Sequence, residues 1–196
     1  MTTFVGIDLA SAPEYGAKRY NRLGLAALDD RLNVIDANAG RFTDRHIFDF
    51  VRLNQAALVA IDSPLSWPVS GILREVDRLL IKHGFRPYPP LLPSMVALTM
   101  RGIALRAALQ EEGFDVIEAF PGAAQDVLGL PRKQTSKESL AVGLRCLGIH
   151  PPTKLDGDML DAVTAAYVEH CYLSGSYEAI GSNTDVQVIN PRLEVS

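Results

Sequence analysis

Three short apolar runs along the chain each end in a single carboxylate. The runs are Val5–Asp8, Leu58–Asp62 and Asp115–Glu118, and residues typical of turns follow each of them. A short apolar run bounded by turn signals is typical of a strand buried on both faces, as in a parallel sheet. Parallel neighbouring strands would bring their acidic ends to one sheet edge, where open α/β sheets place their sites. The pattern therefore predicts a carboxylate cluster at that edge.

The remaining segments alternate between strand and helix patterns. Two strands are predicted over residues 22–28 and 32–36, joined by a tight turn. Apolar residues at helical spacing, together with capping residues, predict helices over residues 42–54, 71–83, 95–113, about 136–148 and about 156–175. We therefore expect a single α/β domain over residues 1–196, with a helical insertion at about 70–113. The last third is expected to be helical, with a short returning strand in residues 182–196.

Small residues on two strands and on the last helix predict close packing between them. Gly6 and Ala60 each lie two residues before a strand-terminal aspartate, and hence on the same strand face as that aspartate. The last helix carries its own stripe of small residues, Ala162, Ala165 and Ala166. Two small surfaces let a helix approach a sheet closely.

This close approach would bring two further acids to the strand ends. Asp158 and Asp161 are three residues apart in the first turns of the last helix, and so share a face. With Asp8 and Asp62 they would make four carboxylates that repel one another unless cations neutralise them. Oxygen ligands suit Mg²⁺ or Mn²⁺, and two such ions about 3.5–4 Å apart serve phosphodiester hydrolysis. We therefore expect these four aspartates to be metal ligands and catalytic residues.

Each acid also has a structural interpretation when it is taken alone. Asp62 and Asp8 stand before turn residues and are suited to turn hydrogen bonds. Asp158 lies where a helix N-terminus favours negative charge without any metal. Glu118, at the end of the third run, is equally ambiguous between a catalytic and a structural role. The prediction of a site rests on their joint placement.

Composition permits this fold and excludes several classes of protein. A chain of 196 residues, 47% hydrophobic and 21% charged, is long enough for one sizeable core. The chain has no apolar run of membrane-spanning length and no signal-peptide layout, so we expect a cytoplasmic protein without a membrane partner. Cys146 and Cys171 fall in helical patterns, where buried thiols are expected rather than a zinc site.

Charge is unevenly distributed, although the chain carries only −4 overall. Residues 71–106 contain six basic and two acidic side chains, whereas residues 156–196 contain seven acidic side chains and one arginine. This asymmetry fits either a phosphate-facing insertion beside a metal-binding helix or ordinary solvated helix surface. Phosphate contacts require only charge and reach. The expected substrate-binding residues are Arg74, Arg78, Lys18 and Arg101, and a second basic group contains Arg132, Lys133 and Lys137.

Five motifs, in chain order, resemble those of the domain of unknown function 429 family, described as predicted nucleases of ribonuclease H-like fold. They are Gly6-Ile7-Asp8-Leu9-Ala10, Ile61-Asp62-Ser63-Pro64-Leu65, Arg74-Glu75-Val76-Asp77, Val116-Ile117-Glu118-Ala119-Phe120-Pro121-Gly122 and Asp158-Met159-Leu160-Asp161-Ala162. The resemblance spans nearly the whole chain. This chain departs from the family pattern at Val76, where a cysteine is expected, and at Gly157, where a histidine is frequent.

The resemblance implies a mixed sheet of five main strands flanked by helices, the first three strands antiparallel and the rest parallel. It also implies an acidic metal site built from the first strand, the fourth strand and the last helix. By that implication Asp8, Asp62, Asp158 and Asp161 are the ligands of Mg²⁺ or Mn²⁺, and Glu118 is a neighbouring acid.

Two functional classes follow from these patterns. The first is a divalent-metal-dependent nuclease that hydrolyses phosphodiester bonds with two metal ions, and its partner is nucleic acid. The second is a catalytically silent binding or scaffold protein that keeps the acidic residues as structure. A sugar-kinase-like phosphotransferase would need glycine-rich phosphate loops, and a serine hydrolase would need a Gly-x-Ser-x-Gly elbow. Neither feature is present in the sequence. The sequence also does not indicate the oligomeric state.

Overall fold

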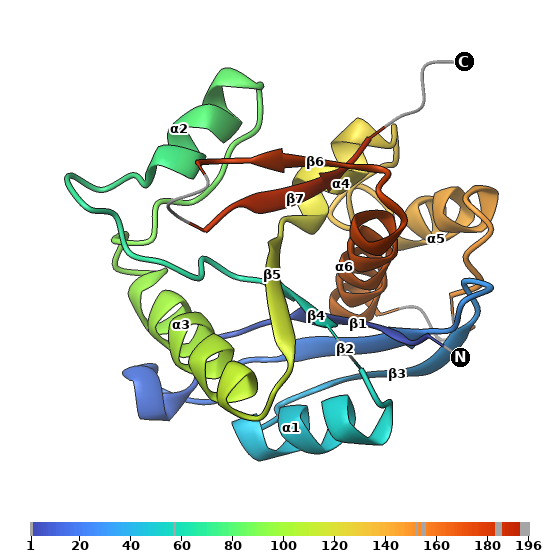
Figure 1. The fold of residues 1–196 in the computed structure, drawn as a ribbon, viewed down its shortest axis with the longest axis horizontal. Coiled ribbons are helices and arrows are strands. Elements are labelled where there is room, and N and C mark those ends of the chain that lie inside the picture. The colour runs from blue at the N-terminus through green and yellow to red at the C-terminus, as the bar shows by residue number, and fades with distance from the viewer. Residues whose placement is uncertain (1, 57, 152, 154–155, 183–185, 193–196) are drawn as a thin grey trace.

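Seven strands form one mixed sheet in the part of the chain that the computed structural model describes, namely residues 2–56, 58–151, 153, 156–182 and 186–192 (Figure 1). The strand order across the sheet is β3-β2-β1-β4-β5-β7-β6. The strands are β1 (Phe4–Asp8), β2 (Leu23–Leu28), β3 (Val34–Gly40), β4 (Leu58–Asp62), β5 (Asp115–Ala119), β6 (Tyr177–Ile180) and β7 (Val188–Pro191).

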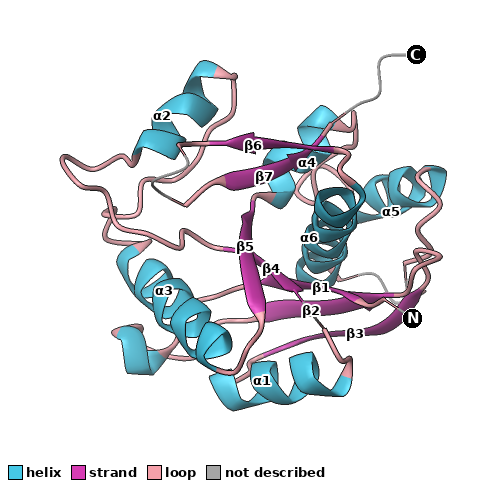
Figure 2. Ribbon diagram, in the orientation of Figure 1, coloured by secondary structure: helices cyan, strands magenta, loops and turns pink. Residues whose placement is uncertain are grey.

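Helices cover both faces of this sheet (Figure 2). They are α1 (Asp44–Leu53), α2 (Glu75–Lys82), α3 (Val96–Glu111), α4 (Pro121–Val127), α5 (Lys137–Cys146) and α6 (Gly157–Ser174), with a short 3-10 helix at Pro13–Tyr15. Helices α1 and α3 pack on one face, where Val5, Ile7 and Ile61 point. Helices α4, α5 and α6 pack on the other face. None of the described helices combines the length and hydropathy needed to cross a membrane.

The strand directions confirm the expected α/β architecture. β1, β2 and β3 pair antiparallel, β4 is parallel to β1, and β5 is parallel to β4. The expected number of five strands is too low, because β7 pairs parallel with β5 and β6 pairs antiparallel with β7. These two strands are only four residues long, too short to show a clear alternation of apolar and polar residues. β7 is the short returning strand expected within residues 182–196, whereas β6 was not expected.

A second difference concerns the segment after β5. The sequence suggests a turn at Pro121-Gly122, but Pro121 instead occupies the first position of helix α4. Proline suits that position because its fixed φ matches a helix and its missing N–H would have no helical partner. This short helix packs against α6 and brings Gln125 into the interior.

The contact between α6 and the sheet is as close as the small residues predict. A Cβ atom added to Gly6 would overlap the backbone of Ala162 and Ala166, and one added to Gly24 on β2 would overlap the backbone of Asp158. The side chain of Asp156 caps α6 by accepting a hydrogen bond from the Asp158 N–H. Two glycines on neighbouring strands thus fix the distance of α6 from β1 and β2.

Gly6→Ala tests this constraint on packing. Inserting a side chain into a well-packed interior costs about 1–3 kcal/mol, and the overlap here is with backbone, which cannot rotate away. We expect a loss of at least about 3 kcal/mol in the free energy of unfolding, measured by urea denaturation. Gly143→Ala on α5 is the control with a small expected effect, because the one close approach of its added Cβ is to the end of the flexible Leu130 side chain, at 2.7 Å. A Gly6→Ala variant as stable as the wild type would contradict the packing described.

One buried acid in this interface lies away from the strand ends. Glu169 on α6 is fully buried, and its Oε2 accepts a hydrogen bond of 2.6 Å from the Val5 N–H. Its Oε1 has no hydrogen-bond partner among the residues that the structure describes. Burial raises the pKa of Glu169 well above its ordinary value, and the Val5 hydrogen bond opposes this only in part. The fold therefore favours the protonated carboxyl.

Glu169→Gln should change how stability depends on pH. Because the folded-state pKa is raised, the contribution of Glu169 to stability is fully present below the unfolded value, about 4.3, and is lost as the pH rises through the folded value. Glutamine keeps an oxygen acceptor for Val5 and cannot ionise. We expect the stability of the variant relative to wild type to increase as the pH rises above about 4 in urea denaturation series. A difference independent of pH would contradict this assignment.

Candidate active site

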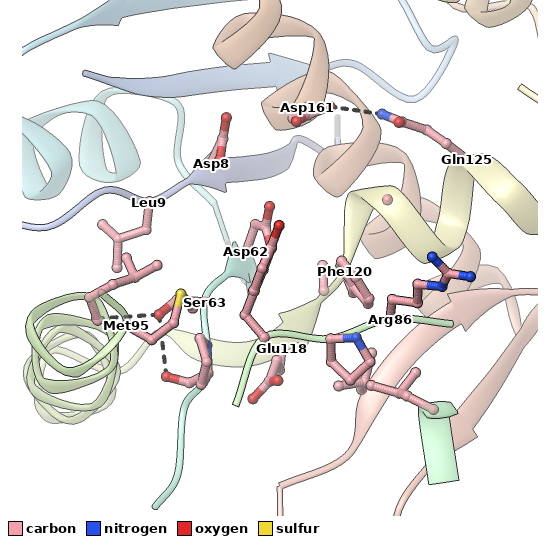
Figure 3. A pocket seen from close by; sticks show the side chains of 18 of the residues that line it. Asp8, Leu9, Asp62, Ser63, Arg86, Met95, Glu118, Phe120, Gln125 and Asp161 are labelled. Atoms are coloured by element: carbon pink, nitrogen blue, oxygen red, sulfur yellow. Dashed lines mark hydrogen bonds between the residues drawn. The ribbon is translucent and has the colours of Figure 1, made fainter. Parts of the chain in front are cut away.

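Asp8 and Asp62 lie side by side at the ends of two parallel strands. They are register partners on β1 and β4. The preceding residues Ile7 and Ile61 point into the core beneath α1 and α3, so both aspartates point to the opposite face, which carries α6. Figure 3 shows the two carboxylates facing the cavity together with Asp161. These two strand-terminal acids thus lie together in the structure, as the sequence predicts.

The first turns of α6 supply the other two predicted acids. Asp158 and Asp161 both come within hydrogen-bond distance of one cation, the Nζ of Lys133. Asp161 is almost fully buried, and Asp158 is held near the surface beside Arg22, whose Nε lies 3.6 Å from its Oδ2. The structure thus brings together all four aspartates that the sequence proposed as metal ligands.

Lys133 is the residue at the centre of this group. Its Nζ lies 3.0 Å from Asp8 Oδ2, 3.1 Å from Asp158 Oδ1 and 2.8 Å from Asp161 Oδ2. Lys133 belongs to the loop between α4 and α5, and its side chain passes over Gly157, where an added Cβ would lie 3.1 Å from Lys133 Cδ. The sequence placed Lys133 in a basic group without assigning it to the aspartates.

The pKa values at the site are shifted because several carboxylates lie close together and are largely buried. Burial, followed by the neighbouring carboxylate of Asp161, raises the pKa of Asp8 to about 7, although Lys133 opposes this shift. Burial and the negative charge of Asp8 raise the pKa of Asp62 well above its ordinary value. The pKa of Lys133 is raised because Asp8 and Asp161 stabilise its charged form more than burial disfavours it. The site therefore has a strong electrostatic preference for additional positive charge.

Gln125 is a site residue that sequence reasoning did not find. Its Nε2 donates hydrogen bonds to Asp161 Oδ1 at 2.8 Å and to Thr164 Oγ1 at 3.2 Å, and it is buried (Figure 3). These contacts orient the Asp161 carboxylate. The signal that was available is Pro121, since a proline at a helix start would have predicted α4 and placed Gln125 on it.

Glu118 lines the same cavity, but it is paired with Arg74 instead of joining the aspartates, which corrects the catalytic role considered for it. It is the register partner of Ile61, one residue before the partner of Asp62, so its side chain leaves the opposite face of the sheet. There Arg74 donates two hydrogen bonds of 2.7 Å to its carboxylate, and the Leu65 N–H donates another. Glu118 therefore links Arg74 and the backbone at Leu65 beside the site.

Two of the expected substrate contacts are buried and need the same correction. Arg74 binds Asp77 and Glu118, and Arg101 binds Asp44 together with the backbone carbonyls of Ala10 and Phe42. Their guanidinium groups are engaged inside the protein, so they are not free to bind phosphate. The other two, Arg78 and Lys18, are exposed but do not line the cavity at the aspartates.

A cavity of about 570 Å³ opens beside the four-carboxylate group. Asp8, Asp62 and Asp161 line one part of it, and apolar side chains line another, among them Leu9, Met95, Leu98 and Phe120 (Figure 3). Its basic lining residues are Arg74, Arg86, Arg132 and Lys133. Arg132 is bound to Asp126, whereas Arg86 is exposed and has no ion pair with any described residue. Arg86 thus replaces Arg74 as the cation available to a ligand.

Metal ligation is not preformed in this arrangement. Within the described ranges, no three His, Cys, Asp or Glu side chains surround a common point in the way that would hold a metal ion. Lys133 stands between three of the aspartates, which separates their oxygens around an ammonium group. The donor set itself, carboxylate oxygen alone, is of the kind that binds Mg²⁺ or Mn²⁺.

Solved structures identify the fold. RuvC of Thermus thermophilus in complex with a Holliday junction substrate superposes with a TM-score of 0.55 at 12% sequence identity, covering 89% of this chain and 97% of that chain. A second Thermus thermophilus RuvC structure gives a TM-score of 0.52 at the same identity and coverage. The chain has a ribonuclease H-like fold. No protein-family profile matches it, and no curated protein sequence does, so the family named above rests on its motifs.

Arg74→Met tests whether the buried arginine is structural. The change leaves the carboxylates of Asp77 and Glu118 buried without a cation, and removing one partner of a buried ion pair costs about 3–5 kcal/mol. We expect a loss of that size in urea denaturation, with little change for Arg78→Met on the exposed side of the same helix. A stable Arg74→Met variant with weakened nucleic-acid binding would instead restore Arg74 to its predicted role as a phosphate contact.

Proposed function

We propose that this protein is a divalent-metal-dependent nuclease that hydrolyses phosphodiester bonds. The observation that carries the proposal is the grouping of four aspartates at one cavity: Asp8, Asp62 and Asp161 line it, and Lys133 contacts Asp8, Asp158 and Asp161. The ribonuclease H-like fold supports a nuclease, and the Holliday junction bound by the similar RuvC supports nucleic acid as the partner class.

The four aspartates are the proposed ligands of Mg²⁺ or Mn²⁺. Asp62 fits this role best, because it borders the cavity and no described residue forms a hydrogen bond with its carboxylate. Burial raises the pKa of Asp8 and of Asp62, and the positive charge of Lys133 offsets this only in part. A divalent ion held by these carboxylates would supply further positive charge, and the chemistry it would add is a lowered pKa of a bound water molecule.

The residues of the chain would position the reacting groups in this hydrolysis. The oxygen of a water molecule bonds to phosphorus while one phosphorus–oxygen ester bond breaks, and the water proton passes through solvent to the departing oxygen. The products are a terminal phosphate and a hydroxyl group. Gln125 holds Asp161 in place, and Arg86 offers positive charge to a neighbouring phosphate of the substrate.

The size and lining of the cavity support a substrate that places a larger group than a phosphate inside it. Its volume of about 570 Å³ is within the range of ligand pockets and far exceeds the space of one water molecule, about 30 Å³. Its apolar wall, formed in part by Met95, Leu98 and Phe120, would receive the uncharged part of a nucleotide. Tyr88, exposed at the cavity, is suited to stack on a base.

A silent binding or scaffold protein is the second candidate, and one observation favours it. Lys133 already makes three charge-assisted contacts with the aspartates, so part of their repulsion is relieved without any metal. In that case the acidic residues would serve the packing of α6 against the sheet. The two candidates differ in whether the protein binds Mn²⁺ and cleaves nucleic acid.

Asp62→Asn distinguishes these candidates. Wild type and variant are incubated with single-stranded, duplex, hybrid and four-way-junction substrates, with Mg²⁺, Mn²⁺ or a chelator. We expect metal-dependent cleavage by the wild type and a loss of at least about 100-fold in the variant, since removing even outer partners of metal ligands costs 10–100-fold. Asp49→Asn is the matched control, because Asp49 lies on the exposed side of α1, and its activity should be unchanged. Absence of both cleavage and Mn²⁺ binding in the wild type would favour the silent protein.

A further inference from the structure

We propose that Lys133 takes the place of one of the two divalent ions, so that the site holds one metal ion, between Asp8 and Asp62, and one lysine ammonium. This inference rests on the proposed nuclease function and replaces the two-ion arrangement expected from the carboxylate count. It assigns Lys133 as a positioning residue that neutralises and fixes three of the aspartates.

The contacts of Lys133 are those of a bound cation rather than of a surface side chain. Its ammonium group has three N–H donors, and three different carboxylates lie within 3.1 Å of the nitrogen. These carboxylates come from β1 and from α6, so Lys133 joins the two elements whose approach forms the site. Its side chain is only 23% exposed.

The loop around Lys133 is built to hold it in this position. Arg132 forms two hydrogen bonds with the Asp126 carboxylate on α4, at 2.8 and 2.6 Å, and its carbonyl accepts hydrogen bonds from the N–H groups of Thr135 and Ser136. The absence of a side chain at Gly157 leaves the space through which the lysine passes. The contacts of Arg132 and the space above Gly157 therefore fix the position of the Lys133 side chain.

The oxygens that remain define where a metal ion would bind. Both oxygens of Asp161 are engaged, Oδ1 by Gln125 and Oδ2 by Lys133. Asp158 gives one oxygen to Lys133 and the other to the nearby Arg22. Among the described residues, the contacts of Asp8 involve its Oδ2 and none forms a hydrogen bond with Asp62, which leaves Asp8 Oδ1 and the Asp62 carboxylate for another cation. Because Asp8 and Asp62 are register partners that border the cavity, one ion entering from the cavity reaches both.

The number of bound ions tests this inference independently of catalysis. Mn²⁺ binding is measured by calorimetry, and electron paramagnetic resonance reports whether two ions lie about 3.5–4 Å apart, where their spins couple. We expect one uncoupled ion per chain in the wild type and two coupled ions in Lys133→Met, which frees the oxygens of Asp8, Asp158 and Asp161 that the lysine contacts. Lys137→Met, in the first turn of α5, is the matched control and should still bind one ion.

Each result has a defined meaning. Two coupled ions in the wild type, or a folded Lys133→Met variant that still binds one, would overturn the assignment of Lys133 and leave the proposed nuclease function standing. Absence of Mn²⁺ binding in every variant, together with absence of cleavage, would overturn both. Lys133→Gln, which keeps an amide donor without the charge, carries the same expectation of two ions if Lys133→Met does not fold.

Discussion

The close contact of helix α6 with strands β1 and β2 is the constraint on which the rest of the site depends. Gly6 and Gly24 lack side chains where α6 crosses them, and a methyl group at either would overlap helix backbone. Since α6 begins next to Gly24, this contact also sets the position of Asp158 and Asp161 relative to Asp8 on the adjacent strand. Packing and chemistry are thus determined by the same few atoms, and a change that moves α6 moves half of the carboxylates.

The same approach creates an electrostatic problem that the fold solves only in part. Four carboxylates at close quarters are unfavourable, and Lys133 compensates three of them, while burial raises the pKa of Asp62 well above its ordinary value. On the other face of the sheet Arg74 binds Asp77 and Glu118 together. There one buried arginine pairs with two buried acids, whereas the α6 face retains unbalanced negative charge beside an open cavity. Such an imbalance is typical of functional sites rather than of structural ion pairs.

Much of the fold and the four aspartates were predictable because their signals are local. An apolar run that ends in an acid predicts a strand with a carboxylate at its end. Small residues at strand and helix spacing predict which strands and which helix pack closely against each other. Glu118 was misplaced because β5 pairs with β4 one residue out of step with the acids, and register is set by long-range packing that the run itself does not contain. Arg74 was misassigned for a similar reason, since its partner Glu118 is 44 residues away in the chain.

Lys133 shows most clearly what the sequence lacked. It lies 125 residues from Asp8 and 25 from Asp158, in a loop without a motif, and only the folded chain brings it to both. The glycine at position 157 was visible as a departure from the family pattern, but its meaning depends on the side chain that crosses it. A lysine that occupies a cation position satisfies carboxylates permanently, whereas an ion can leave. Asp62, the acid that Lys133 does not reach, is therefore the residue at which a metal-binding nuclease and a silent scaffold differ most.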